Sequence, residues 1–127
     1  MILILVVEDT QPLLRTIEII LKRDGYEVIT ASNGQEAIER LEEEWTANQR
    51  LPALILSDLG MPVMNGLELY SALHANPRYD SIPFVAITGG NFPPSSYENL
   101  NFEAVILKPF RLEELLGPLR RLATKGN

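Results

Sequence analysis

The 127-residue sequence predicts an α/β fold in which a parallel sheet carries helices on both faces. Five short apolar segments are rich in β-branched residues, and the first and third run uninterrupted, as strands buried on both faces do. Between them lie segments whose apolar residues recur at helical spacing. Alternation of this kind is typical of doubly wound sheets, because parallel strands need a crossover between them.

The first half of the chain predicts three strands and two helices. ILILVV at residues 2–7 is the first strand, and the helix after it has Ile17 and Leu21 on its apolar face. Pro12 near the start of that helix and Gly25 just past its end are typical boundaries. The following predicted elements are a strand at 26–31, a helix at 33–45, a polar loop at 46–52 and a strand at 53–57.

The second half predicts two more strands and two helices. Residues 89–103 contain two prolines and little apolar periodicity, so they are expected to form a short helix at best. Gly117 and Pro118 are expected to kink the last helix or break it in two. The predicted elements are a helix at 66–75, strands at 83–88 and 104–107, and a helix at 112–123. Five such strands commonly take the flavodoxin-like order 2-1-3-4-5 with right-handed crossovers.

Polar residues follow the predicted strands where each one ends. Residues after parallel strands gather at one edge of the sheet, where ligands bind. The residues concerned are Glu8 and Asp9 after the first strand, Asp58 after the third, Thr88 at the end of the fourth, and Lys108 and Pro109 after the fifth. The first and third strands are expected to be neighbours, so their three carboxylates should share one pocket.

Three carboxylates in one pocket repel each other, and a cation offsets that repulsion at neutral pH. Hard oxygen ligands favour Mg²⁺ over zinc, and the main-chain carbonyl of Gly60 is expected to complete the metal shell. A carboxylate beside Mg²⁺, with Lys108 and Thr88 in reach, is suited to accept a phosphoryl group as an aspartyl phosphate. Gly60 and Gly66 are expected to let the backbone turn closely around this site.

The motifs VVED, DLGMPVMNG, AITGG and LKPF, in this order along the chain, resemble those of the response regulator receiver domain of two-component signal transduction systems, in its stand-alone form. The resemblance covers essentially the whole chain, residues 1–127, as a single domain. It implies that a histidine kinase or a histidine phosphotransfer protein phosphorylates Asp58, and that Glu8 and Asp9 bind Mg²⁺. It also implies a switch role for Thr88, a phosphate contact for Lys108 and a cis Lys108–Pro109 bond.

Three departures from the family pattern affect signalling. Val105 stands where the family usually has Tyr or Phe, so the usual aromatic coupling to Thr88 is missing. The proline-bearing segment after Thr88 is short, which predicts a remodelled signalling face. Gly60 and Gly90 are small where many members carry side chains that affect the access of water to the phosphoryl group. This predicts a phosphoryl lifetime that differs from that of members with bulky residues at these positions.

Other functions remain open at this stage. A receiver-like module that signals without phosphorylation is the main alternative, suggested by Val105 and opposed by the intact Asp58 and Lys108. An enzyme is not expected. A flavin phosphate would need a Ser/Thr/Gly loop after the first strand, where Glu8 and Asp9 stand, and aspartate phosphatases usually carry a second acid at the position of Gly60.

Composition narrows the partners and the location. A net charge of −6 gives no broad positive surface for binding nucleic acid. No apolar run approaches the roughly 20 residues that a helix needs to cross a membrane. The chain has no cysteine, and its start does not have the pattern of a signal peptide, so a cytoplasmic protein is expected. The expected partners are the phosphodonor, a downstream protein and, through the last helix and its neighbours, a second copy in a homodimer.

Overall fold

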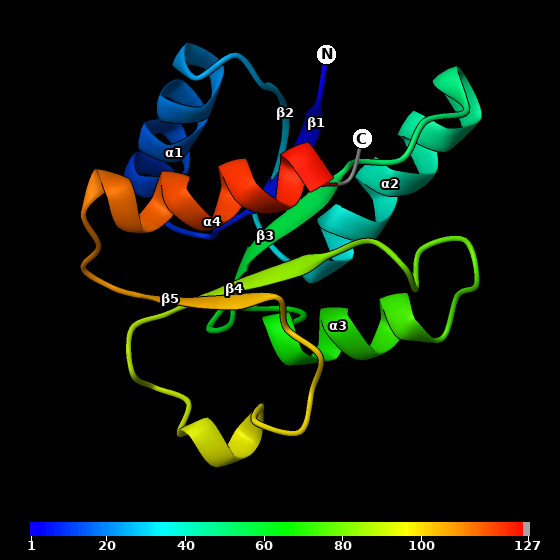
Figure 1. Ribbon diagram of the computed structural model, residues 1–127. Helices are drawn as coiled ribbons and strands as arrows, with labels where there is room; N and C mark the ends of the chain where they lie inside the picture. The colour runs from blue at the N-terminus through cyan, green and yellow to red at the C-terminus, as the bar shows by residue number, and fades with distance from the viewer. Residues whose placement is uncertain (126–127) are drawn as a thin grey trace.

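The computed structural model describes residues 1–125, which contain one five-stranded parallel sheet (Figure 1). The strands are β1 (Leu3–Val7), β2 (Glu27–Ala31), β3 (Leu54–Asp58), β4 (Phe84–Thr88) and β5 (Ala104–Leu107). They lie in the order β2-β1-β3-β4-β5, and every neighbouring pair is parallel. The predicted fold class and strand order are confirmed, with strand ends shifted by a residue.

Helices cover both faces of the sheet, as predicted. They are α1 (Gln11–Arg23), α2 (Gly34–Asn48), α3 (Gly66–His74) and α4 (Leu112–Lys125), with a short 3₁₀ helix, η1 (Pro94–Ser96). Side chains alternate along each strand, so Ile4 and Val6 pack toward α1 and α4, while Leu5 and Val7 pack toward α2 and α3. Among the residues described, no helix is both long and apolar enough to cross a membrane.

Local side-chain contacts fix where α2 and α3 begin. Asn33 accepts a hydrogen bond from the Glu36 amide at 2.9 Å at the start of α2. Asn65 and Glu68 form a reciprocal capping box at the start of α3, with bonds of 2.8 and 2.9 Å. These caps place the helix starts within a residue of the predicted ones.

Helix α2 is longer than predicted, because it continues to Asn48 through half of the expected polar loop. Residues 46–48 contain no proline or glycine to stop it. The helix ends at Gln49, whose φ of 53° is left-handed and whose amide donates to the Trp45 carbonyl at 2.9 Å. Polarity alone was therefore the wrong signal for a loop here.

Helix α4 runs unbroken through Pro118, so of the two expected outcomes, a kink or a break, the break is wrong. Proline removes one backbone donor, and its ring clashes with the Cβ of a helical residue before it. Gly117 has no Cβ, which relieves that clash. The helix also buries Leu115, Leu119 and Leu122 against the sheet, and this packing opposes a break.

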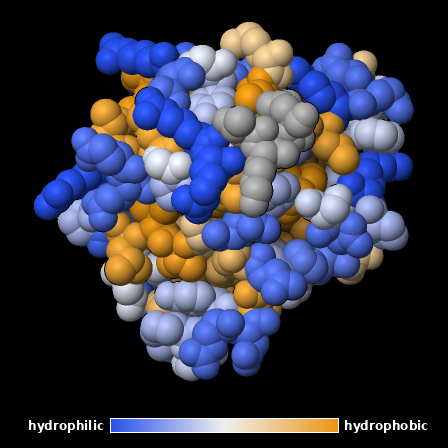
Figure 2. Space-filling view, in the orientation of Figure 1, coloured by the Kyte–Doolittle hydropathy of each residue, from blue (hydrophilic) through white to orange (hydrophobic). Residues whose placement is uncertain are grey.

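The segment between β4 and β5 holds only the three-residue η1, as expected for a poor helix. Its aromatic rings pack toward α3: Phe102 lies 5.0 Å from Tyr70 and 5.8 Å from Tyr97 between ring centroids. The segment leaves β5 open, where Val105 and Leu107 are 37% and 62% exposed. Figure 2 shows the resulting hydrophobic surface over β5.

The two edges of the sheet differ. On β2, the outward carbonyl of Thr30 accepts a hydrogen bond from the Arg40 guanidinium at 3.2 Å. On β5, the Lys108 amide donates to the Thr88 carbonyl at 2.9 Å, and Thr88 lies opposite Leu107, so the backbone groups of Leu107 point outward by alternation. Within residues 1–125, no side chain covers those outward groups of β5 in the way that Arg40 covers β2.

Candidate functional site

Three carboxylates meet at the carboxyl edge of the sheet. Glu8 and Asp9 directly follow β1, and Asp58 is the last residue of the adjacent β3. Each of the three offers an oxygen, and these oxygens lie within 4.8 Å of one another. Glu8 and Asp58 are buried and Asp9 is half-buried, so two of the three carboxylates are shielded from bulk water. The topology therefore brings together residues 50 positions apart, as the strand ends predicted.

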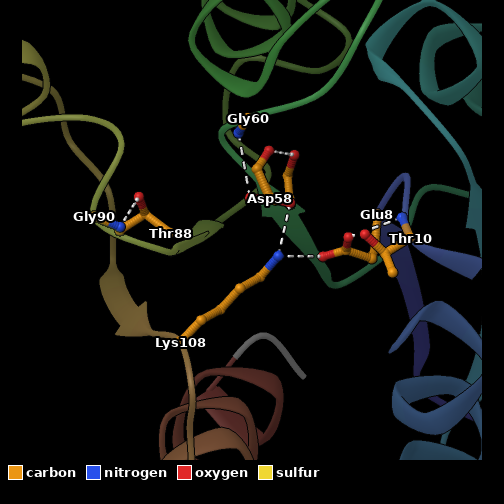
Figure 3. Close-up of polar contacts among 8 residues, drawn as sticks. Glu8, Thr10, Asp58, Gly60, Thr88, Gly90 and Lys108 are labelled. Atoms are coloured by element: carbon orange, nitrogen blue, oxygen red, sulfur yellow. Dashed lines mark hydrogen bonds and ion pairs between the residues drawn. The ribbon is translucent and has the colours of Figure 1, made fainter. Parts of the chain in front are cut away.

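Lys108 bridges two of these carboxylates (Figure 3). Its Nζ lies 2.9 Å from Asp58 Oδ2 and 3.0 Å from Glu8 Oε1. Burial alone would lower the pKa of Lys108, but its hydrogen bond to Asp58 and its ion pair with Glu8 outweigh burial and raise the pKa above its usual value. Lys108 is therefore a fixed cation in the site.

Glu8 is the most deeply buried of the acids, with no exposed surface. Burial raises the pKa of its carboxyl, and the negative charge of Asp58 raises it further; the Thr10 amide and Lys108 oppose this without cancelling it. Its Oε2 accepts a hydrogen bond from the Thr10 amide at 3.0 Å. Its Oε1 is in ion-pair range of Lys108 but has no well-aligned hydrogen bond within the described chain.

This donor set fits a magnesium ion. Every available ligand is a hard oxygen, and the chain has no cysteine and a single histidine, His74, which lies on α3. The Glu8 oxygen without a well-aligned donor is a group that a cation would satisfy. Glu8, Asp9 and Asp58 are the residues that could hold the ion.

Thr88 completes the constellation from the end of β4. It is 2% exposed, and its hydroxyl oxygen accepts a hydrogen bond from the Gly90 amide at 3.3 Å. Together with Asp9, Asp58 and Lys108, it lines a cavity of about 290 Å³. The Lys108–Pro109 peptide bond beside this cavity is cis.

The turn after β3 is held in place by backbone contacts. The Gly66 amide donates to the Leu59 carbonyl at 3.0 Å, and the Gly34 amide donates to the Met64 carbonyl at 2.9 Å. A Cβ on Gly66 would lie 2.8 Å from Leu59 Cα and closer still to the Asp58 carbonyl oxygen. Glycine is thus required at position 66 because the chain folds back onto the strand that presents Asp58.

Position 60 has no such requirement, since a Cβ there would make only ordinary contacts. The Gly60 amide donates to Asp58 Oδ1 at 3.2 Å and so helps to orient the carboxylate. Among the cavity residues that sequence reasoning missed are Asn91 and Phe92. Their position within four residues of Thr88 indicated that they could reach the site. The segment around them is irregular, so the sequence did not show which way their side chains point.

The comparison with protein families agrees with this geometry. The family model described as the response regulator receiver domain matches residues 4–120. The chain belongs to this family. The receiver domain is 37% identical over 124 residues to the chemotaxis protein CheY1 of Helicobacter pylori, covering 90% of this chain and 96% of CheY1.

Other relatives differ in length. The receiver domain is 38% identical over 113 residues to histidine kinase P4 of Formosa agariphila, covering 87% of this chain but only 8% of the kinase. Among solved structures, the chemotaxis response regulator CheY4 of Vibrio cholerae is similar with a TM-score of 0.80 and 30% identity, covering 96% of this chain and 98% of CheY4. The receiver domain thus spans nearly all of some relatives and a small part of another.

Proposed function

We propose that this receiver domain accepts a phosphoryl group on Asp58 from a sensor histidine kinase or a histidine phosphotransfer protein and signals through protein–protein contacts. The observation that supports this most is the position of Lys108 Nζ, 2.9 Å from Asp58 Oδ2, beside two further carboxylates. An aspartate that is buried, paired with a fixed cation and open to a cavity has the surroundings that a phosphoacceptor needs.

Each side chain has a role in the transfer. An Asp58 oxygen attacks the phosphorus of the donor phosphohistidine; the new O–P bond forms as the N–P bond breaks, and the imidazole nitrogen keeps the electron pair. Lys108 then contacts a phosphoryl oxygen, and the Thr88 hydroxyl donates to another. Glu8, Asp9, Asp58 and the Gly60 carbonyl would hold Mg²⁺, which supplies charge neutralisation on the phosphoryl oxygens.

The output is proposed to be a contact with a downstream protein or with a second copy of the chain, and not an enzymatic reaction or direct binding of nucleic acid. Exposed Val105 and Leu107 on β5 support an interface there, together with Leu112 at the start of α4, which is 51% exposed. Organisation as one receiver domain over residues 1–127 and a cytoplasmic location stay predictions of the sequence.

The test is the intact mass of the protein after incubation with acetyl phosphate, with and without Mg²⁺. We expect a phosphoryl adduct that requires Mg²⁺, disappears in Asp58→Asn and persists in Asp80→Asn, which removes an exposed carboxylate elsewhere. If folded protein forms no adduct with acetyl phosphate or with a phosphorylated histidine donor, the phosphorylation-independent module becomes the better account.

A further inference from the structure

Phe92 lies near Asp58, the proposed phosphoacceptor, and next to Gly60, which has no side chain. A Cβ placed on Gly60 would lie 3.5 Å from Phe92 Cε2 and 3.9 Å from Asn91 Nδ2. Phe92 also lines the 290 Å³ cavity that contains Asp58 and Thr88. The ring therefore forms part of the cavity wall from the β4–β5 segment, on the side of Gly60.

The ring is held in this place by the core. Phe92 is partly buried and packs against the hydrophobic cluster between the sheet and helices α2 and α3. Gly60 next to Asp58 and Gly90 next to Thr88 have no side chains (Figure 3), and a Cβ on Gly90 would have nothing within 4 Å.

We propose that Phe92 shields the phosphoryl group on Asp58 from water and thereby sets its lifetime. This inference rests on the proposed phosphorylation of Asp58. In hydrolysis, a water oxygen attacks the phosphorus, the bond from phosphorus to the Asp58 oxygen breaks, and the carboxylate keeps the electron pair. Inorganic phosphate leaves with the water oxygen and both of its protons, as dihydrogen phosphate. An apolar ring in the wall of the cavity limits the approach of that water, because it offers no hydrogen bond and occupies space beside Asp58.

The test follows decay of the phosphoryl adduct after the phosphodonor is removed, by intact mass, in wild type and three variants. Phe92→Ala opens the wall, and the adduct should decay severalfold faster, about threefold or more. Phe92→Leu keeps an apolar side chain there and should decay nearly as wild type does. Tyr97→Ala is the matched control, since Tyr97 packs on Phe102 in the same segment but does not line the cavity.

The outcomes separate this inference from the proposed function. If wild type forms no adduct with any phosphohistidine donor, the proposed function fails. If the adduct forms but decays equally fast in wild type and Phe92→Ala, only the shielding role is overturned. Equal acceleration by Tyr97→Ala would also overturn it, because the cause would then be a loosened segment. Should Phe92→Ala fail to fold, Phe92→Val replaces it, with an intermediate decay rate expected.

Discussion

At the scale of single residues, the site contains more negative charge than its one lysine can balance. Lys108 sits between Asp58 and Glu8, while Asp9 adds a third carboxylate to the same cavity. Two like charges about 4 Å apart repel by roughly 4 kcal/mol at an effective dielectric near 20. A bound divalent cation relieves that repulsion in the folded state only, so metal binding and stability should be linked.

Mg²⁺ is therefore expected to raise the melting temperature of the protein. At a concentration about 100 times its Kd, a ligand that binds only the folded state adds about 2.7 kcal/mol to the unfolding free energy. Thermal denaturation with and without Mg²⁺ measures this. Asp9→Asn should reduce the increase, and Asp80→Asn should leave it intact. An equal increase in wild type and Asp9→Asn would rule out Asp9 as a ligand.

Gly66→Ala should destabilise the fold by about 1–3 kcal/mol, because overpacking forces the backbone to shift. The new methyl group would meet main-chain atoms of Asp58 and Leu59, which cannot rotate away. Urea denaturation measures the loss, with Ser71→Ala, an exposed change on the same helix, as the control. Equal stability of the two variants would show that the turn can move without cost.

At the scale of elements, an ion pair connects the end of α1 to α4. The Arg120 guanidinium donates through Nε to Asp24 at 2.9 Å and makes a second bond through its other nitrogen. The hydrogen bonds from Arg120 hold the pKa of Asp24 below its usual value of 3.8. A carboxyl whose pKa is lower in the folded state contributes stability above its unfolded pKa, and that contribution disappears as the pH falls through the folded pKa.

Arg120→Gln should therefore lower the melting temperature slightly between pH 5 and 7, and the difference from wild type should shrink below about pH 4. The effect is small because the pair is solvent-screened. Arg121→Gln changes the net charge equally but removes no ion pair within the described residues, so it serves as the control. A difference from wild type that stays constant down to pH 3 would mean that Asp24 is not the partner involved.

The sequence predicted elements where local chemistry and tertiary packing agree, and it erred where they compete. Pro12 and Gly25 marked the boundaries of a helix that the structure has. Pro118 marked a break that burial of the surrounding leucines overrides. Asp58 and Lys108 could be placed because strand ends converge in any parallel sheet. Phe92 could not, because the irregular segment that carries it has no periodicity from which to derive its direction.

At the scale of the whole molecule, β5 combines exposed apolar side chains with an open edge. If the proposed output includes a homodimer through this face, phosphorylation should convert monomer to dimer in sedimentation velocity. Leu107→Glu should keep the phosphorylated protein monomeric, because it places a charge on the apolar surface. Ile19→Glu changes a 44% exposed residue on α1 and should dimerise as wild type does. A dimer in both variants would place the interface elsewhere.

The unequal edges of the sheet also limit how large such an assembly can grow. When both edge strands of a sheet are free, further copies can add at either edge without limit, as in fibres. Here Arg40 occupies an outward carbonyl of β2, while β5 stays open. Two copies that meet through β5 would leave only their β2 edges outermost. Growth beyond a pair would have to proceed through β2, where Arg40 must first leave the Thr30 carbonyl.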